Sequence, residues 1–210
     1  MNLLILGPQG SGKGTQARLL ADSLGLYYFE TGDYLREIAK KDAHINEIVN
    51  KKGELIPDEE IFSLVSRFLT QKLPNLDNFI LDGYPRSLKQ YELIKSWLSG
   101  KGKKINWAIY LSLSKEESLT RITARRTCAK CDRVYNLITN PPPTPEVCEC
   151  GGRLRQRQDD TLEIVQNRLA IYEKTTAPLI EIMKRDGILL AIDGEKPIET
   201  ILKEIISKVA

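Results

Sequence analysis

The chain has 210 residues, of which 41% are hydrophobic and 28% are charged, and its formal net charge is +3. This length suits one α/β domain with insertions, or one domain with a small second domain. The net charge is too small to require nucleic acid as a partner. Because the sequence has no apolar run of about 18 residues, we expect no membrane-spanning helix and no membrane partner.

Short apolar runs alternate with helical patterns along the chain. The apolar runs predict five strands, at Leu3–Leu6, Leu26–Phe29, Phe79–Leu81, Trp107–Leu113 and Ile188–Ile192. Strands separated by helices predict a parallel sheet with helices on both faces. Ligands bind such sheets at the carboxyl ends of the strands, so we expect the functional residues there.

Helical patterns cover residues 17–24, 33–40, 57–73, 87–98, 114 to about 126 and 162–172, and a last helix begins at Pro197. Ser114 with Glu117 forms a capping box that opens the fifth of these helices. This helix places Arg121 and Arg125 four residues apart, so we expect them to share one helical face.

Residues Gly7–Thr15 read Gly-Pro-Gln-Gly-Ser-Gly-Lys-Gly-Thr and lie between the first strand and the first helix. A glycine-rich turn in this position directs backbone N–H groups into one hollow, and the helix N-terminus adds partial positive charge. Lys13 adds an ammonium group, so the segment predicts a polyphosphate site. Gly14 stands where the usual pattern has Ser or Thr for Mg²⁺, and Thr15 follows one residue later.

All four cysteines lie in one stretch, Thr127–Gly152, that has no helical period. The pairs Cys128/Cys131 and Cys148/Cys150 predict a tetrahedral structural Zn²⁺ site. The alternative is four free or partly paired thiols in a loop. A site closed by four thiolates stabilises its segment and has no open position for catalysis. Clustered cysteines also indicate a reducing compartment, so we expect a cytoplasmic protein.

Basic residues outnumber acidic residues around these cysteines, with eight Lys/Arg against three Asp/Glu from Arg121 to Arg157. One interpretation is a solvated face. The other is a lid that closes over phosphates, since guanidinium groups bind phosphate oxygens with two parallel hydrogen bonds.

The chain resembles the adenylate kinase family, in its form with a long, zinc-containing lid. The resemblance rests on the motifs at residues 7–15, 31–36 (Thr-Gly-Asp-Tyr-Leu-Arg), 53–58 (Gly-Glu-Leu-Ile-Pro-Asp), 81–86 (Leu-Asp-Gly-Tyr-Pro-Arg), 121–126 and 157–160, and on Arg168. It implies a P-loop three-layer α/β/α core with a five-stranded parallel sheet, formed by residues 1–29, 57–124 and 161–210. It further implies a helical AMP-binding flap at residues 30–56 and a lid with a Cys₄ zinc site at residues 125–160.

The resemblance also implies the reversible reaction Mg·ATP + AMP ⇌ Mg·ADP + ADP, carried out by a monomer. The ATP site it implies comprises Gly10, Ser11, Gly12, Lys13, Gly14, Thr15, Arg121, Arg125, Val134, Tyr135 and Lys196. The AMP site comprises Thr31, Arg36, Glu54, Leu55, Ile56, Gly83, Tyr84, Pro85, Arg86, Gln90, Arg157 and Arg168. The implied catalytic residues are Lys13, Asp82, Arg86, Arg121, Arg125, Arg157, Asp159 and Arg168, among which Asp82 orients Mg²⁺ through water.

Several of these residues have a second, structural interpretation. Gln90 completes a capping box with Ser87 or contacts adenine. Thr31 caps the following helix or lies beside the nucleobase, and Asp159 and Asp160 are helix N-caps unless they act in the site. The one histidine, His44, lies in a polar stretch and is expected at the surface.

Three other functions are considered. A UMP/CMP kinase generally has a short lid without cysteines and a small apolar residue at the position of Thr31, so both features favour AMP here. A zinc-ribbon ATPase that binds nucleic acid would use the cysteine pairs and arginines, but the mild net charge disfavours it. A nucleotide-sensing module would bind through the same arginines without turnover.

Overall fold

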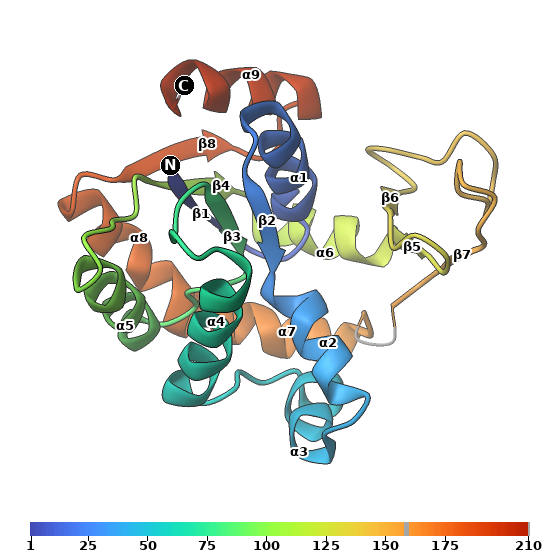
Figure 1. Cartoon of the computed structure of the whole chain (residues 1–210). Helices are drawn as coiled ribbons and strands as arrows, with labels where there is room; N and C mark the ends of the chain where they lie inside the picture. Colours follow the sequence, from blue (N-terminus) through green and yellow to red (C-terminus); the bar gives the residue numbers. More distant parts are fainter. Residues whose placement is uncertain (158–159, 210) are drawn as a thin grey trace.

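The computed structural model describes residues 1–157 and 160–209 (Figure 1). Its central sheet has five parallel strands in the order β2-β3-β1-β4-β8, as predicted. The strands are β1 (Asn2–Leu6), β2 (Tyr27–Glu30), β3 (Phe79–Asp82), β4 (Trp107–Ser112) and β8 (Leu189–Asp193). β1 lies in the middle, so the loop that follows it emerges at the centre of the sheet's carboxyl edge.

Helices cover both faces of the sheet because side chains alternate along β1. Leu3 and Ile5 belong to the core under α1 (Lys13–Leu24) and α9 (Ile198–Val209). Leu4 and Leu6 belong to the core on the opposite face. That face is covered by α4 (Asp58–Lys72), α5 (Leu88–Ser99) and α8 (Ala177–Arg185), and Figure 1 shows the two layers on either side of the strands.

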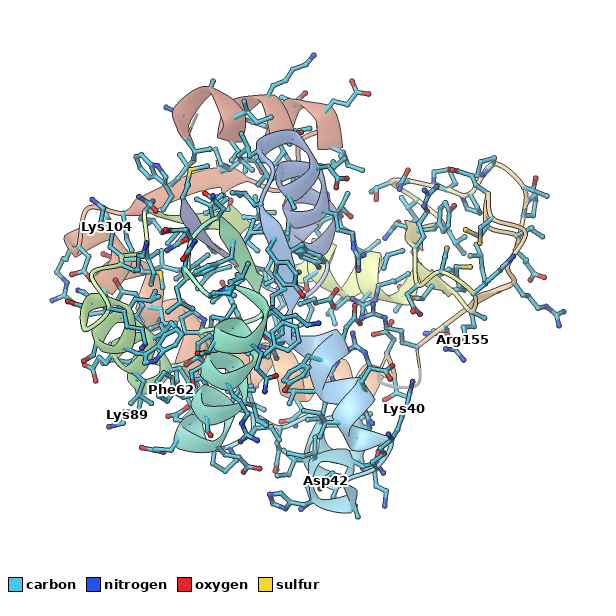
Figure 2. The ribbon with its side chains drawn as sticks, in the orientation of Figure 1. Lys40, Asp42, Phe62, Lys89, Lys104 and Arg155 are labelled. Atoms are coloured by element: carbon cyan, nitrogen blue, oxygen red, sulfur yellow. The ribbon has the colours of Figure 1, made fainter. Side chains whose placement is uncertain are left out.

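Two segments extend from the carboxyl side of the sheet, and we call them the flap (residues 30–56) and the lid (residues 125–160). The flap contains three short helical elements, α2 (Thr31–Ala39), α3 (Ala43–Asn46) and the π-helical η1 (Glu47–Lys52). In Figure 2, Lys40 in the flap and Arg155 in the lid lie toward the same side of the molecule, away from Lys104.

The lid carries a three-stranded antiparallel sheet in the order β6-β5-β7. Its strands are β5 (Arg125–Cys128), β6 (Val134–Asn136) and β7 (Leu154–Arg155). It is connected to the core by α6 (Lys115–Thr123) on one side and by α7 (Leu162–Ile171) on the other, which continues through η2 (Tyr172–Thr176) into α8.

The expected helix from Ser114 to about Arg126 is corrected, because α6 ends at Thr123. Arg125 is instead the first residue of β5, where it pairs with Asn136. The lid strands give this segment backbone partners that sequence periodicity does not reveal. Arg121 and Arg125 therefore do not share a helical face. α8 was also absent from the sequence-based prediction.

Among residues 1–157 and 160–209, no helix combines the length and the apolar character that crossing a membrane requires.

Candidate functional site

One large cavity, about 3540 Å³ including space open to solvent, lies where the sheet's carboxyl edge meets the flap and the lid. Its lining includes nearly all the nucleotide-binding and catalytic residues expected from the sequence that the structure describes. Pro85 is the exception, and it lines a smaller adjoining pocket of about 560 Å³. Asp159 lies outside the described residues. Residues from distant parts of the chain are thus brought together at one place.

The loop after β1 has the backbone form of an anion site. Gly10 and Gly12 have φ angles of 81° and 87°, a left-handed conformation that favours glycine. Gly12 precedes α1 and provides no side-chain cap, so the first N–H groups of the helix have no side-chain acceptor. These groups and the helix dipole attract a negatively charged ligand.

Lys13 is partly buried beside this loop, with its Nζ 2.8 Å from the carbonyl oxygen of Pro8. Burial lowers the pKa of Lys13 to about 8, although the carboxylate of Asp82 opposes the shift. The ammonium group is therefore held in a site that penalises its charge. A bound anion would relieve that penalty.

Two acidic groups, Glu30 and Asp82, also line the cavity. Asp82 at the end of β3 is 6% exposed, and burial raises its pKa while Lys13 and Arg86 oppose the rise. The hydroxyl of Tyr28 lies 2.9 Å from Glu30 Oε2 and 3.2 Å from Asp82 Oδ2. Burial, followed by the nearby charge of Asp82, raises the pKa of Glu30 to about 7.

Arg86 lies where β3 leads toward α5, and its Nε donates to the carbonyl oxygen of Gly83 at 2.7 Å. Burial and the neighbouring charge of Arg168 lower the pKa of Arg86 to about 10. Arg168 on α7 donates to the carbonyl oxygen of Val49 at 3.3 Å. Arg157 reaches Thr127 Oγ1 at 3.2 Å. Three guanidinium groups from separate elements thus border one cavity.

Arg121 and Arg125 reach the same cavity by different routes. Arg121 pairs with Glu117 at 2.7 Å and donates to the carbonyl oxygen of Gly194 at 2.8 Å. Arg125 forms a two-pronged ion pair with Asp160, whose side chain is fully buried. Asp160 is not a helix N-cap, which corrects that interpretation, because Thr161 caps α7.

The structure also decides whether Thr31 and Gln90 act as helix caps. Thr31 is the first residue of α2, not its cap, and its hydroxyl is buried without a hydrogen-bond partner. Ser87 Oγ caps α5 by accepting from the Gln90 backbone N–H at 3.1 Å. The Gln90 side chain does not complete the box, since it binds Arg86 and Asp58 instead. His44 is exposed, as expected.

Comparison with known proteins gives the same family as the sequence motifs. The adenylate kinase family model matches residues 5–188. An adenylate kinase of Archaeoglobus fulgidus is 43% identical over 98% of this chain and 96% of its own length. Adenylate kinases of Geobacter sp. and Petrotoga mobilis are 41% and 40% identical, covering 100% and 98% of the chain and 99% and 95% of the relatives.

The chain belongs to the adenylate kinase family. This membership agrees with the cavity, in which an anion-binding loop faces a set of arginines.

Within this adenylate kinase fold, the four cysteines gather at the outer part of the lid. Their Sγ atoms all lie within 4.8 Å of one another. The Cys128–Cys150 and Cys131–Cys148 Sγ distances are both 3.6 Å, and Cys131–Cys150 is 3.3 Å. A tetrahedral Zn²⁺ with Zn–S bonds of about 2.3 Å requires Sγ distances of about 3.8 Å, so the donor set fits zinc.

Sequence reasoning missed three polar residues of this site. Tyr28 and Glu30 alternate on β2 and face Asp82, and Asp58 in the first turn of α4 contacts Gln90. The alternation of polar residues at the end of an apolar strand is a signal that could have identified the first two. Asp58 gave no such signal, because acidic residues in a first helical turn are common.

A first prediction concerns the pH dependence of anion binding. Because the pKa of Lys13 is about 8, the free protein loses this positive charge as the pH rises through that value. Affinity for inorganic tripolyphosphate should therefore fall about tenfold between pH 7 and pH 9, with proton uptake on binding, measured by isothermal titration calorimetry.

The matched control is Lys13→Arg, which stays charged over this range. The affinity of this variant should depend much less on pH. Any dependence that remains reports the ionisation of tripolyphosphate itself and can be subtracted from that of the wild type. Equal pH dependence in both proteins would contradict the lowered pKa.

Proposed function

We propose that this protein catalyses the reversible transfer of a phosphoryl group from Mg·ATP to AMP, which yields two ADP. Family membership and relatives named adenylate kinase support this activity. The observation that carries it is the joint position of Lys13, Arg86 and Arg168 in a cavity large enough for two nucleotides. Transfer between phosphates requires little covalent chemistry from the protein, so positioning and neutralisation of charge account for catalysis.

ATP binds at the P-loop, with its phosphates on the amides of Gly10–Thr15 and on Lys13. Arg121 and Arg125 contact the phosphates from the lid side. Val134, Tyr135 and Lys196 border the adenine. The support for this orientation is that the loop, the lid strand β6 and the turn after β8 all line the same large cavity.

AMP binds on the flap side, between α2 and the turn after β3. The residues that hold it are Thr31, Arg36, Glu54, Leu55, Ile56, Gly83, Tyr84, Pro85, Arg86, Gln90, Arg157 and Arg168. Support comes from the unpartnered buried hydroxyl of Thr31 and from the lowered pKa of Arg86. A phosphate dianion beside Arg86 and Arg168 would offset the mutual repulsion of these guanidinium groups.

Mg²⁺ bound with ATP neutralises phosphate charge. Asp82 is the carboxylate that would orient its water ligands, because Asp82 Oδ2 lies 3.4 Å from where a Cβ on Gly14 would stand. A side chain at position 14 would meet this carboxylate and the Tyr28 hydroxyl. Asp159 belongs to the same proposed catalytic set.

The chain divides into a core (residues 1–29, 57–124 and 161–210), the flap and the lid. Closure of the flap and lid excludes water, which would otherwise hydrolyse ATP. Among the described residues, hydrogen bonds between the lid and the core include Asn136 Nδ2 to the carbonyl oxygen of Arg121 and the Leu137 N–H to that of Ala124. Rotation at residues 123–125 would keep the lid strands intact.

The four cysteines hold a structural Zn²⁺ that stabilises the lid. Apart from Tyr135 and Leu154, the buried lid cluster consists of cysteines, so the segment has little hydrophobic core of its own. The hydrogen bond between Tyr135 Oη and Cys148 Sγ, at 3.3 Å, connects the sheet to the metal ligands. We place the enzyme in the cytoplasm, in keeping with four cysteines that are free thiols. The family resemblance also implies a monomer.

The decisive test is ADP formation from Mg·ATP with AMP, GMP, CMP and UMP in turn. AMP should have a kcat/KM at least about a hundredfold higher than the other three nucleotides. A preference for UMP or CMP would indicate the pyrimidine kinase alternative. ATP hydrolysis stimulated by RNA or DNA would indicate the nucleic-acid alternative, and binding without turnover a sensing module.

Arg86→Ala should lower kcat by about a hundredfold or more, because it removes a partly buried positive charge beside the AMP phosphate that accepts the transferred group. Steady-state kinetics with AMP measures the effect, and thermal unfolding checks that the protein remains folded. Arg67→Ala, an exposed position on α4 outside the cavity, is the control and should retain activity. Comparable activity in the two variants would refute the role of Arg86.

Replacing Cys128 and Cys131 by serine should lower Tm by about 5 °C or more, since each kcal/mol corresponds to about 2–4 °C for a chain of this size. Activity at low temperature should fall much less, because the site has no open position for substrate. Differential scanning calorimetry and elemental analysis measure the two effects. Unchanged Tm together with a metal-free wild-type protein would remove the zinc assignment.

A further inference from the structure

The Gln90 side chain is held from two directions by groups of opposite hydrogen-bonding character. The backbone N–H of Arg86 donates to Gln90 Oε1 at 2.7 Å. Gln90 Nε2 donates to Asp58 Oδ1 at 2.8 Å. The residue is 2% exposed and lines the main cavity.

These two partners determine which end of the amide is oxygen. A backbone N–H can only donate and an ionised carboxylate can only accept. Rotating the amide by half a turn would place two donors against each other at Arg86 and two acceptors against each other at Asp58. Both contacts would be unfavourable in a buried site.

Asp58 is itself fixed by a second contact. Its Oδ1 also accepts from Ser87 Oγ at 2.8 Å, while Ser87 Oγ accepts from the Gln90 N–H. Asp58, Ser87 and Gln90 thus form a closed set of hydrogen bonds between the start of α4 and the start of α5. The position of the Gln90 side chain therefore depends on the packing of two helices.

An amide has two N–H donors and two acceptor lone pairs. One donor is used by Asp58 and one lone pair by Arg86, so Gln90 retains one N–H and one lone pair in a fixed order. We propose that Asp58 is a specificity-determining positioning residue, which fixes this order and thereby selects 6-aminopurine over 6-oxopurine monophosphates.

This inference rests on the proposed function, in which Gln90 contacts the base of AMP. Adenine offers an N6–H donor next to the N1 acceptor, which complements a lone pair next to an N–H. Hypoxanthine and guanine offer the O6 acceptor next to an N1–H donor, which is the reverse order. Since the monophosphate is anchored elsewhere, the base cannot turn over to restore the match.

The experiment compares kcat/KM for AMP and for inosine monophosphate (IMP), which differs from AMP only at the 6-position and N1. In Asp58→Ala, a flipped Gln90 amide no longer faces a carboxylate with its oxygen, so only the contact with the Arg86 N–H opposes the flip. The ratio of kcat/KM for AMP to kcat/KM for IMP should therefore fall about tenfold. The change should lie mainly in KM for AMP, because Asp58 does not touch the phosphates.

Asp58→Asn is the matched variant, since it loses the same charge at the start of α4 but keeps a carbonyl acceptor for Gln90. It should restore most of the AMP/IMP ratio. Glu59→Ala removes a neighbouring charge from an exposed side chain whose ion-pair partner is Lys89, and should leave the ratio unchanged.

The outcomes separate this inference from the proposed function. A wild-type protein that does not phosphorylate AMP would overturn the function itself. An active wild type with equal AMP/IMP ratios in Asp58→Ala and in wild type would overturn the role of Asp58 alone. A ratio reduced equally in the Ala and Asn variants would show that charge, and not the acceptor, controls selectivity, and would also overturn it.

Discussion

Burial of charge at one edge of the sheet is the constraint on which the site depends. Burial lowers the pKa of Lys13 to about 8 and that of Arg86 to about 10, and raises that of Glu30 to about 7. Each group is thus held where its charged form is disfavoured. The hydrophobic clusters on both faces of the sheet supply the stability that offsets this cost. A phosphate bound between Lys13 and Arg86 would replace the repulsion between these two positive charges by attraction to the phosphate.

The same constraint explains the arrangement of the acidic groups. Burial raises the pKa of Asp82, and the positive charges of Lys13 and Arg86 oppose this rise. The Tyr28 hydroxyl on the neighbouring strand β2 donates a hydrogen bond to Asp82, which helps to fix the position of the carboxylate. Flap, lid and core therefore meet around a cavity in which both signs of charge are already positioned before any nucleotide arrives.

Much of the fold could be predicted from local patterns. The five strands and the P-loop depend on apolar runs and glycine positions, which act within a few residues. The end of α6 could not be predicted in this way, because Arg125 leaves the helix to pair with Asn136 of the lid strand β6. The role of Asp160 was missed for a similar reason, since its partner Arg125 lies 35 residues away.

The sequence alone determined the family, the parallel sheet and the residue types of the site, because motif spacing and periodicity are encoded locally. Only the tertiary structure decided which groups contact each other: Arg125 with Asp160, Tyr28 with Asp82, and Gln90 with both Arg86 and Asp58. These pairings depend on how separate helices and strands pack. A hydrogen bond between distant residues leaves no periodic signal in the chain.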